Sequence, residues 1–244
     1  MILVCAFVLF GIIDAPTSAP LPKGEPMAFA SGPETPQEKE GEKVLVQYLQ
    51  VSKRSIIRGV TMMAHFVGRV PKLQRTATLD AKRHITKDGL LEYSPTDRQG
   101  DASVQKELII RFINGEMESA VKDNTKVAIS NENYKFKYKG ARDMDGRTAH
   151  VFELNPRKKR EGLFKGELWL DAETGLSLRE TGRFVKSPSV FLKKVEFVRE
   201  YTIREGVAVP KAMQSSIQTR FWGTAELDIQ YSDVVWEDPR FLAN

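Results

Sequence analysis

The sequence predicts an α+β fold in which an open, strongly curved antiparallel β-sheet packs against two helices. Segments that alternate apolar and polar side chains follow one another from Tyr134 to Ile203, as in strands with one buried face. Turns rich in Asp, Gly, Ser and Pro separate these segments, which is typical of an antiparallel meander. We expect about ten or eleven strands, and a sheet of that size curls on itself, here into an unclosed barrel.

The meander begins at Tyr134, where aromatic residues alternate with lysines as far as Lys139. A later hairpin turns at Gly223. Pro210 indicates that the first strand of this hairpin begins late or lies at a sheet edge. The strands predicted after the first are 148–154, 164–170, 176–185, 190–203, 207–222 and 224–234.

The region before the meander is expected to supply both helices and three strands. Apolar residues recur at helical spacing over 42–53 and 104–121. Gly115 costs the second helix roughly 1 kcal/mol relative to Ala, and we expect a weak point there. The polar segment 95–101 is predicted to form turns. The predicted strands are 56–70, 73–85 and 90–93.

Residues 1–13 carry no charge and are apolar almost throughout. This run is too short to span a bilayer and fits the apolar region of a secretory signal, although a buried N-terminal strand or helix has the same composition. Small residues at 28 and 30 favour cleavage after Ala30. We therefore predict a signal peptide over 1–30, a disordered lead over 31–40 and one binding domain over 41–240 of a protein exported to the periplasm.

The sequence contains no recognisable catalytic motif. The single cysteine, Cys5, lies in the predicted signal, so the mature chain would lack a thiol for a disulfide, a zinc site or a nucleophile. The three histidines, His65, His84 and His150, are not spaced as a metal-binding pair. Neither a phosphate-binding glycine loop nor a G-x-S-x-G turn occurs. We therefore predict a protein that is not an enzyme and uses no metal or cofactor.

The formal net charge of +5 and the pI of about 9.2 are compatible with anionic partners. The basic residues are scattered, and the one tight cluster, 157–160, is typical of a solvated loop between strands. No nucleic-acid-binding motif occurs. We expect a monomer that does not bind nucleic acid.

Two small constellations of carboxylates have alternative interpretations. Asp143 and Asp145 could bind a cation weakly, but Asp-Gly turns are common without one. Glu167 and Asp171 flank Trp169 at alternate positions, as in a sugar-contacting face, although a solvated strand face is the simpler interpretation.

Four basic residues fall in the apolar phase of their strands. Lys193 and Arg199 alternate in phase with the aromatic residues of 190–203, and Arg75 and Arg83 do the same in 73–85. An unpaired buried cation is costly, so each needs a partner or a path to water. One interpretation is that they extend out of the sheet rim; the other is an apolar cavity with a cationic lip that suits an anionic amphiphile.

The sequence Tyr138-Lys139-Gly140-Ala141 is followed by Asp145-Gly146-Arg147-Thr148-Ala149, Leu154-Asn155-Pro156, Leu168-Trp169-Leu170-Asp171 and Glu173-Thr174-Gly175-Leu176. This pattern resembles the periplasmic lipoprotein-carrier superfamily, which includes LolA-like and LolB-like carriers and RseB-type regulators. The order of helices and strands extends the resemblance over 44–235. It implies a curved open sheet whose concave side holds a hydrophobic pocket for acyl chains or a lipidated partner.

These observations lead to three functional hypotheses. The first is an envelope binding protein that holds an acyl lipid or a lipoprotein in the concave side of the sheet. The second is a regulatory interaction module that engages a membrane-associated protein partner. A remote third is an enzyme acting on envelope glycans.

The predicted pocket wall combines flexible apolar side chains, which repack readily, with one cation near the opening. The helix over 104–121 is expected to lie across its mouth. The predicted ligand-binding residues are Met62, Phe66, Phe112, Met117, Phe191, Phe197, Arg199 and Tyr201.

Overall fold

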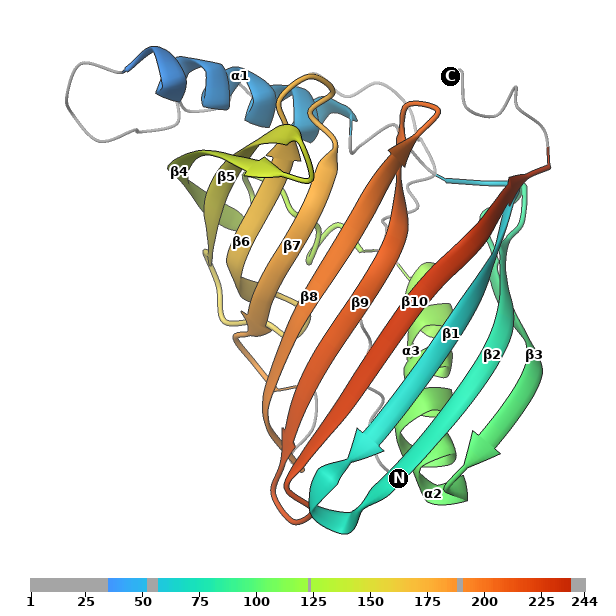
Figure 1. Cartoon of the computed structure of the whole chain (residues 1–244). Coiled ribbons are helices and arrows are strands. Elements are labelled where there is room, and N and C mark those ends of the chain that lie inside the picture. The colour runs from blue at the N-terminus through green and yellow to red at the C-terminus, as the bar shows by residue number, and fades with distance from the viewer. Residues whose placement is uncertain (1–34, 52–56, 123, 188–190, 238–244) are drawn as a thin grey trace.

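The computed structural model describes residues 35–51, 57–122, 124–187 and 191–237. In these residues ten strands form one antiparallel sheet. The order is β3-β2-β1-β10-β9-β8-β7-β6-β5-β4, so β3 and β4 are its edges and the sheet is open (Figure 1). The strands are β1 (Val60–Val70), β2 (Arg75–Ile85), β3 (Leu91–Gly100), β4 (Tyr134–Met144), β5 (Arg147–Pro156), β6 (Phe164–Asp171), β7 (Ser177–Phe184), β8 (Leu192–Arg204), β9 (Val207–Thr219) and β10 (Thr224–Trp236).

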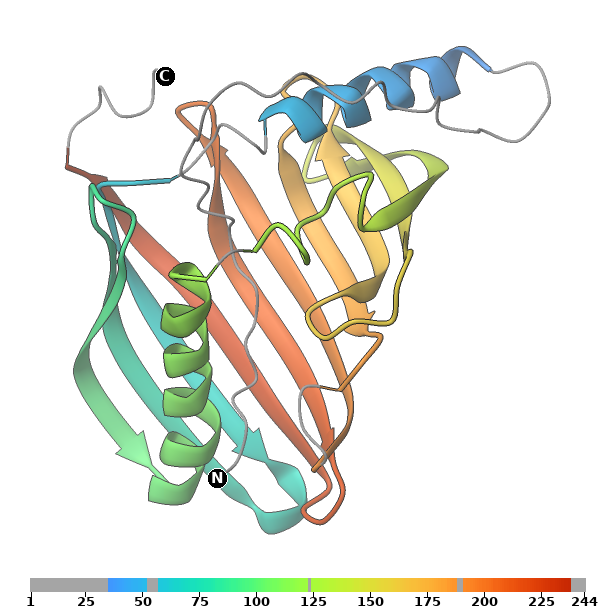
Figure 2. The same cartoon turned by 180° about the vertical axis from the view of Figure 1, so that it is seen from behind.

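Two helices pack into one core with the sheet. Helix α1 (Pro36–Val51) lies across β4, β5 and β6 at the upper end (Figures 1 and 2). A second helix lies over β1, β2 and β3 on the inner face; it consists of α2 (Ala102–Val104), η2 (Gln105–Ile110) and α3 (Arg111–Ala120). These elements confirm the predicted α+β fold with a curved, unclosed antiparallel sheet. Within the described residues, no helix has the length and apolar character needed to cross a bilayer.

Helix α1 begins at Pro36, earlier than the predicted start at residue 42. Thr35 caps it, because the Glu38 N–H donates to Thr35 Oγ1 (3.2 Å) and the Thr35 N–H donates to the Glu38 carboxylate (2.7 Å). This is a capping box, with proline in the first turn where its missing N–H costs nothing. The prediction of a disordered lead over 31–40 is therefore wrong from Pro36 onward. The predicted signal peptide, 1–30, lies outside the described residues.

Strand β3 extends to Gly100 and so includes all but the last residue of the segment 95–101, which the sequence analysis assigned to turns. β3 is an edge strand, and its pairing with β2 is irregular where Pro95 faces Ala81. A proline is tolerated at such a position because the outer side of an edge strand forms no ladder.

Pro210 was expected to mark a strand that begins late or lies at a sheet edge. It lies inside strand β9, which is central in the sheet order. The pairing of β9 with β10 covers only Ala212 to Gln218. On its other side β8 has a register shift between Glu200 and Tyr201, next to Pro210. β9 is thus central in the sheet order, but Pro210 lies in a part of it that pairs with β8 only, which is a local edge that accommodates a residue without an N–H.

The second helix is irregular at a place other than the one predicted. Its N-terminus is capped by the Asp101 carboxylate, which accepts from the N–H groups of Ser103 and Val104 (both 2.9 Å). The π-helical turn is η2, whereas α3 is regular through Gly115, whose carbonyl accepts a bond from Ser119 Oγ (2.8 Å). The helix is therefore regular at Gly115, and the energetic cost of this glycine relative to alanine stays a prediction.

Gly166 of β6 pairs with Gly182 of β7, at a place where neighbouring atoms leave no room for a Cβ on either residue. A Cβ at Gly166 would lie 1.8 Å from the Thr181 carbonyl oxygen, and one at Gly182 would lie 2.4 Å from Phe164 Cδ2. The Phe164 ring thus covers Gly182 and contacts the Phe197 ring at a centroid distance of 5.0 Å. The glycines let an aromatic layer lie directly on the sheet.

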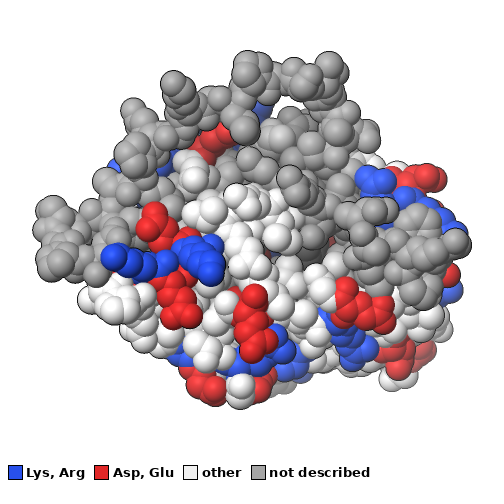
Figure 3. All heavy atoms as spheres, turned by 90° about the horizontal axis from the view of Figure 1, so that it is seen from above, with Lys and Arg blue, Asp and Glu red and all other residues white. Residues whose placement is uncertain are grey.

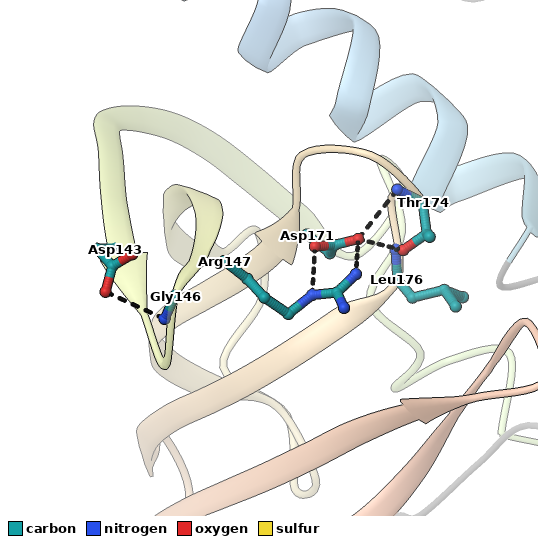
Figure 4. Close-up of polar contacts among 6 residues, drawn as sticks. All are labelled: Asp143, Gly146, Arg147, Asp171, Thr174 and Leu176. Atoms are coloured by element: carbon teal, nitrogen blue, oxygen red, sulfur yellow. Dashed lines mark hydrogen bonds and ion pairs between the residues drawn. The ribbon is translucent and has the colours of Figure 1, made fainter.

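The residues that carry the family resemblance form a structural joint (Figure 4). The buried Asp171 carboxylate accepts from Arg147 Nε (2.9 Å) and Nη2 (3.0 Å), and from the N–H (3.1 Å) and hydroxyl (2.7 Å) of Thr174. Gln47 of α1 donates to the Thr174 carbonyl oxygen (2.9 Å). The motif therefore ties two hairpin turns together and seats α1.

Asp171→Asn is expected to destabilise the fold. Burial raises the pKa of Asp171, but the bonds from Arg147 and Thr174 more than offset this and lower it, so the carboxylate is charged at neutral pH. An amide would place an NH2 group against these donors, at a cost of about 2–4 kcal/mol. Urea unfolding measures the loss. The control is Asp143→Asn, which changes an exposed turn residue that accepts one long bond from the Gly146 N–H (3.3 Å); equal effects of the two would contradict the role given to Asp171.

His150 makes the stability of the domain depend on pH. It is buried, and its Nδ1 lies 2.8 Å from the hydroxyl of Tyr138, whose ring packs against Gly41 of α1. Burial lowers the pKa of His150 below 6.5, opposed by Glu40. The unfolded chain therefore binds the proton more readily than the folded one. The contribution of neutral His150 to the free energy of unfolding is present above about pH 6.5 and is lost as the pH falls. We expect the urea concentration at the unfolding midpoint to decrease as the pH is lowered from about 7.5 to about 5.5. His150→Gln should make this midpoint less dependent on pH, and an unchanged dependence would contradict the role given to His150.

Candidate ligand-binding face

The candidate site is the part of the inner face that lies between the two helices. In the sheet order, β7, β8 and β9 separate the strands under α1 from those under the second helix, as Figure 2 shows. Inward-facing side chains of these three strands combine charge with apolar surface. We define the central strip as Glu180, Phe197, Arg199, Tyr201 and Met213.

The register of the sheet places these side chains together. Arg199 of β8 pairs directly with Glu180 of β7 and with Met213 of β9. Directly opposed residues of antiparallel strands point to the same face. In β8 the buried positions alternate with half-buried ones from Val195 to Tyr201. Arg199 therefore points inward because the period of the strand puts it in phase with the aromatic residues.

The Arg199 guanidinium is held by several groups. Its Nη1 lies 3.2 Å from Glu180 Oε2, and its Cζ lies 4.6 Å from the centroid of the Phe197 ring. The Tyr201 hydroxyl is hydrogen-bonded to Glu180 as well. Burial and then Glu180 raise the pKa of Tyr201 well above its usual value, so the hydroxyl keeps its proton and donates. The strip thus carries one buried ion pair among aromatic rings.

A second buried ion pair fastens the second helix to the sheet. Arg83 Nη2 of β2 lies 3.1 Å from Glu116 Oε1 of α3, and both side chains are at most 3% exposed. The Tyr93 hydroxyl also donates to Glu116. Burial lowers the pKa of Arg83, but Glu116, Tyr93 and Tyr231 raise it further than burial lowers it. The guanidinium stays charged, and the helix is held by charge as well as by packing.

The structure places the predicted site residues in different surroundings. Met62, Phe66, Phe112, Phe197, Arg199 and Tyr201 are buried, and Met117 is half-buried against the core. Phe112 of α3 packs against Phe66 of β1, with ring centroids 6.2 Å apart. Phe191 is 42% exposed at the lower end of the sheet, so it is not brought together with the others. Whether the remaining residues bind a ligand stays a prediction.

The four cations in apolar phase divide into two pairs. Arg83 and Arg199 are buried and face glutamates, whereas Arg75 and Lys193 are exposed near strand ends. Lys193 lies at a register shift of β8, which turns it outward. Arg75 and Lys193 therefore extend into solvent, whereas Arg83 and Arg199 are paired inside the protein.

Sequence reasoning missed the two glutamates. Glu180 alternates in phase with Leu178 in β7, and Glu116 shares a helix face with Phe112 and Ile113. The test applied to cations, a charge in an apolar phase, would have found both residues and predicted the pairing. Met213 was missed because its role depends on register with Arg199.

The other constellations have structural roles. The Trp169 indole donates to Glu167 (3.1 Å), while Asp171 belongs to the turn joint, so no shared sugar-contacting face forms. In the basic loop, Arg157, Lys158 and Lys159 are exposed, as expected for a solvated loop, and Arg157 and Arg160 also donate to backbone carbonyls of 126–134. Among the described residues, no group of three or more potential metal ligands comes together.

Of two hollows, one reaches the central strip at Phe197 and the other lies away from it. One, of about 480 Å³, lies over Gly166 and Gly182 and is lined mostly by charged residues, including Lys165, Glu167 and Glu196. The other, of about 220 Å³, lies beside the basic loop. Neither has the apolar lining expected for an acyl chain.

No protein-family model matches the sequence, and no curated protein matches it. Solved structures do match. A DUF1329 family protein from Desulfovibrio piger has a TM-score of 0.42 and 16% identity, with 83% of this chain and 94% of the other covered. An outer membrane lipoprotein-sorting protein domain from Vibrio parahaemolyticus has a TM-score of 0.40 and 15% identity, with 81% of this chain and 93% of the other covered. A LolA superfamily protein from Nitrosomonas europaea has a TM-score of 0.37 and 10% identity, with 81% of this chain and 94% of the other covered.

MucB, an RseB-type protein, is also among the matches, with a TM-score of 0.30 and 14% identity over 80% of this chain and 93% of MucB. The matching structures thus include the LolA and RseB types that the motif in the sequence indicates.

Removing one partner of the Arg83–Glu116 pair is expected to be costly. In Glu116→Ala the buried guanidinium loses its counterion, for a loss of about 3–5 kcal/mol in the free energy of unfolding. Replacing both partners, by Arg83→Met with Glu116→Leu, is expected to recover most of that loss because no buried charge remains. Glu118→Ala is the matched control on the same helix, since its partner Lys122 is exposed. If Glu116→Ala and Glu118→Ala cost the same, the helix is not held by this pair.

Proposed function

We propose that this chain is a non-enzymatic binding protein of the cell envelope that holds an acyl lipid or a lipidated polypeptide along the central strip. The observation that carries the proposal is the Arg199–Glu180 pair among aromatic side chains, on the part of the inner face between the two helices. The predicted export signal and the motif shared with lipoprotein carriers support the location and the class of ligand.

The ion pair would give the strip its selectivity for anionic headgroups. A phosphate or carboxylate can replace the Glu180 carboxylate as the partner of Arg199, because both present oxygen acceptors to the guanidinium. A neutral headgroup supplies no counterion. If it broke the Arg199–Glu180 pair, the buried guanidinium would be left without an opposite charge in a low-dielectric environment. The strip would therefore prefer an anionic amphiphile to a neutral one.

The aromatic and methionine side chains would accept the acyl chain. Phe197 contacts the rings of Phe164 (5.0 Å) and Phe184 (5.3 Å), and Met213 lies beside Arg199. Such side chains can repack around a flexible chain with little loss of contact. The second helix packs on the same core through Phe112 and Met117, and a movement of this helix would widen the strip.

A regulatory module that binds a membrane-associated protein is the second candidate. It is favoured by the exposed edge strand β4, where Lys135, Lys137 and Lys139 alternate along a strand without a neighbour on one side. Mass spectrometry of protein purified from its host separates the two. Copurifying acyl lipid supports the binding protein, and a stoichiometric protein partner supports the regulator.

Arg199→Ala and Glu180→Gln are expected to change the binding of a fluorescent acyl probe in opposite directions. The first removes the cation, so anionic probes should bind about tenfold more weakly, while neutral probes change little. The second removes the internal competitor for Arg199, so anionic probes should bind more tightly. Titrations with one anionic and one neutral probe of equal chain length measure both. Equal losses for the two probes, or no tightening in Glu180→Gln, would contradict the proposed selectivity.

The apolar wall is tested by Phe197→Asp, which should abolish uptake of both probes, with Phe191→Asp, in the connection just before β8, as the matched control. Stability distinguishes a wall from ordinary core. Phe197→Ala should cost well under the roughly 3–5 kcal/mol typical of a filled core if the strip opens to a ligand. The full cost together with no probe binding by the parent protein would defeat the proposal.

A further inference from the structure

The lower end of the sheet carries a cluster of exposed aromatic side chains. Three connections meet there: η1 (Pro71–Leu73) between β1 and β2, the β7–β8 connection, and the β9–β10 turn. Leu73 is 44% exposed, Phe191 42%, Phe221 66% and Trp222 58%. Among the described residues, these include every exposed phenylalanine or tryptophan. We call these four residues, together with Lys72 and Arg220, the tip.

The exposure of the tip results from a built turn. The Thr219 N–H and hydroxyl both donate to the Gly223 carbonyl (2.9 and 2.8 Å), and the Trp222 N–H donates to Thr219 Oγ1 (3.0 Å). Gly223 has φ +80°, which closes the turn and directs the two aromatic residues before it outward. Such a turn holds Phe221 and Trp222 in solvent rather than letting them fold back onto the sheet.

The three connections are joined to one another. The Arg220 N–H donates to the Phe191 carbonyl (2.9 Å), and the rings of Phe191 and Phe221 have centroids 6.5 Å apart. Lys72 packs beside Gly223, since a Cβ there would lie 3.2 Å from Lys72 Cδ. The tip is therefore one convex surface and not three separate loops.

The charge of the tip has one sign. The chain contains no Asp or Glu in 70–79, 181–195 or 206–225, the stretches that form or flank the three connections. Lys72 and Arg220 lie within the tip, with Lys186 and Lys193 beside it, and all four are exposed. The opposite end differs, because Figure 3 shows acidic and basic side chains interspersed around an uncharged area. A formal net charge of +5 is thus distributed unevenly along the molecule.

We propose that the tip is a docking surface for an anionic lipid bilayer. Trp and Phe partition into the interface between headgroups and acyl chains, and adjacent Lys and Arg residues are attracted to anionic headgroups by about 1 kcal/mol each. A convex surface with basic residues and no acidic ones matches a flat, negatively charged membrane. Docking at this end would hold the strands upright on the bilayer, and it does not depend on the ligand proposed for the central strip.

Vesicle sedimentation tests the docking surface with the full chain. Wild-type protein should bind vesicles of 7:3 phosphatidylcholine and phosphatidylglycerol more tightly than pure phosphatidylcholine, about tenfold or more, and less tightly as salt is raised. Phe221→Ser with Trp222→Ser should lose binding about tenfold or more. Lys72→Gln with Arg220→Gln should lose about tenfold on the anionic vesicles only.

Matched controls use similar residues elsewhere. Leu90→Ser with Val121→Ser changes two exposed apolar residues outside the tip, and Lys39→Gln with Lys43→Gln removes two charges from α1. Both should bind vesicles like wild type. Urea midpoints verify that each variant is folded, and the surface positions make this the expected result.

Equal binding to anionic and neutral vesicles, or tip variants that bind like wild type, would overturn the proposal. So would a wild-type protein that ignores vesicles but loses a stoichiometric protein partner, or a dimeric state, when Phe221 and Trp222 are replaced. Those results would assign the tip to a protein interface instead.

Discussion

The structure depends on covering the inner face of an open ten-stranded sheet. A closed barrel fills its own interior, but an unclosed sheet must bury its apolar face under other elements. Here two helices cover the two flanks, and aromatic side chains fill the space near the centre. The inner face thus divides into two flanks covered by helices and a central strip whose side chains are also buried but lie under neither helix axis, because two helices cannot cover so wide a sheet.

Two arginines on that face show how the covering is fixed in position. Each would be costly to bury alone, and each faces a glutamate, Glu116 for Arg83 and Glu180 for Arg199. The first pair joins a helix to the sheet, so it sets where that helix lies. The second pair joins two neighbouring strands, so it does not fasten a helix. That difference makes the Arg199–Glu180 pair the one that a ligand can exchange without detaching an element of the fold.

The two ends of the molecule have different chemistry. At the upper end, Asp171 joins two turns and the Thr174 carbonyl receives Gln47 of α1, so polar contacts hold the elements together. At the lower end, turns expose aromatic and basic side chains that no described element covers. Polar joints suit a fixed structural end, and exposed aromatic rings suit a surface that meets another phase. The strands connect these ends and carry the central strip between them.

The sequence by itself determined the α+β class, the antiparallel meander and most strand positions, because a period of two and turn-forming residues act locally. The Thr35–Glu38 capping box that starts α1 is also a local motif, but the sequence analysis did not recognise it and placed the start of the helix later. Only the tertiary structure decided which charges in apolar phase are paired. Arg199 and Lys193 share a strand and a phase, yet one faces Glu180 and the other is exposed at a register shift. The tip likewise depends on three connections that are distant in sequence and meet because antiparallel strands return to the same end of the sheet.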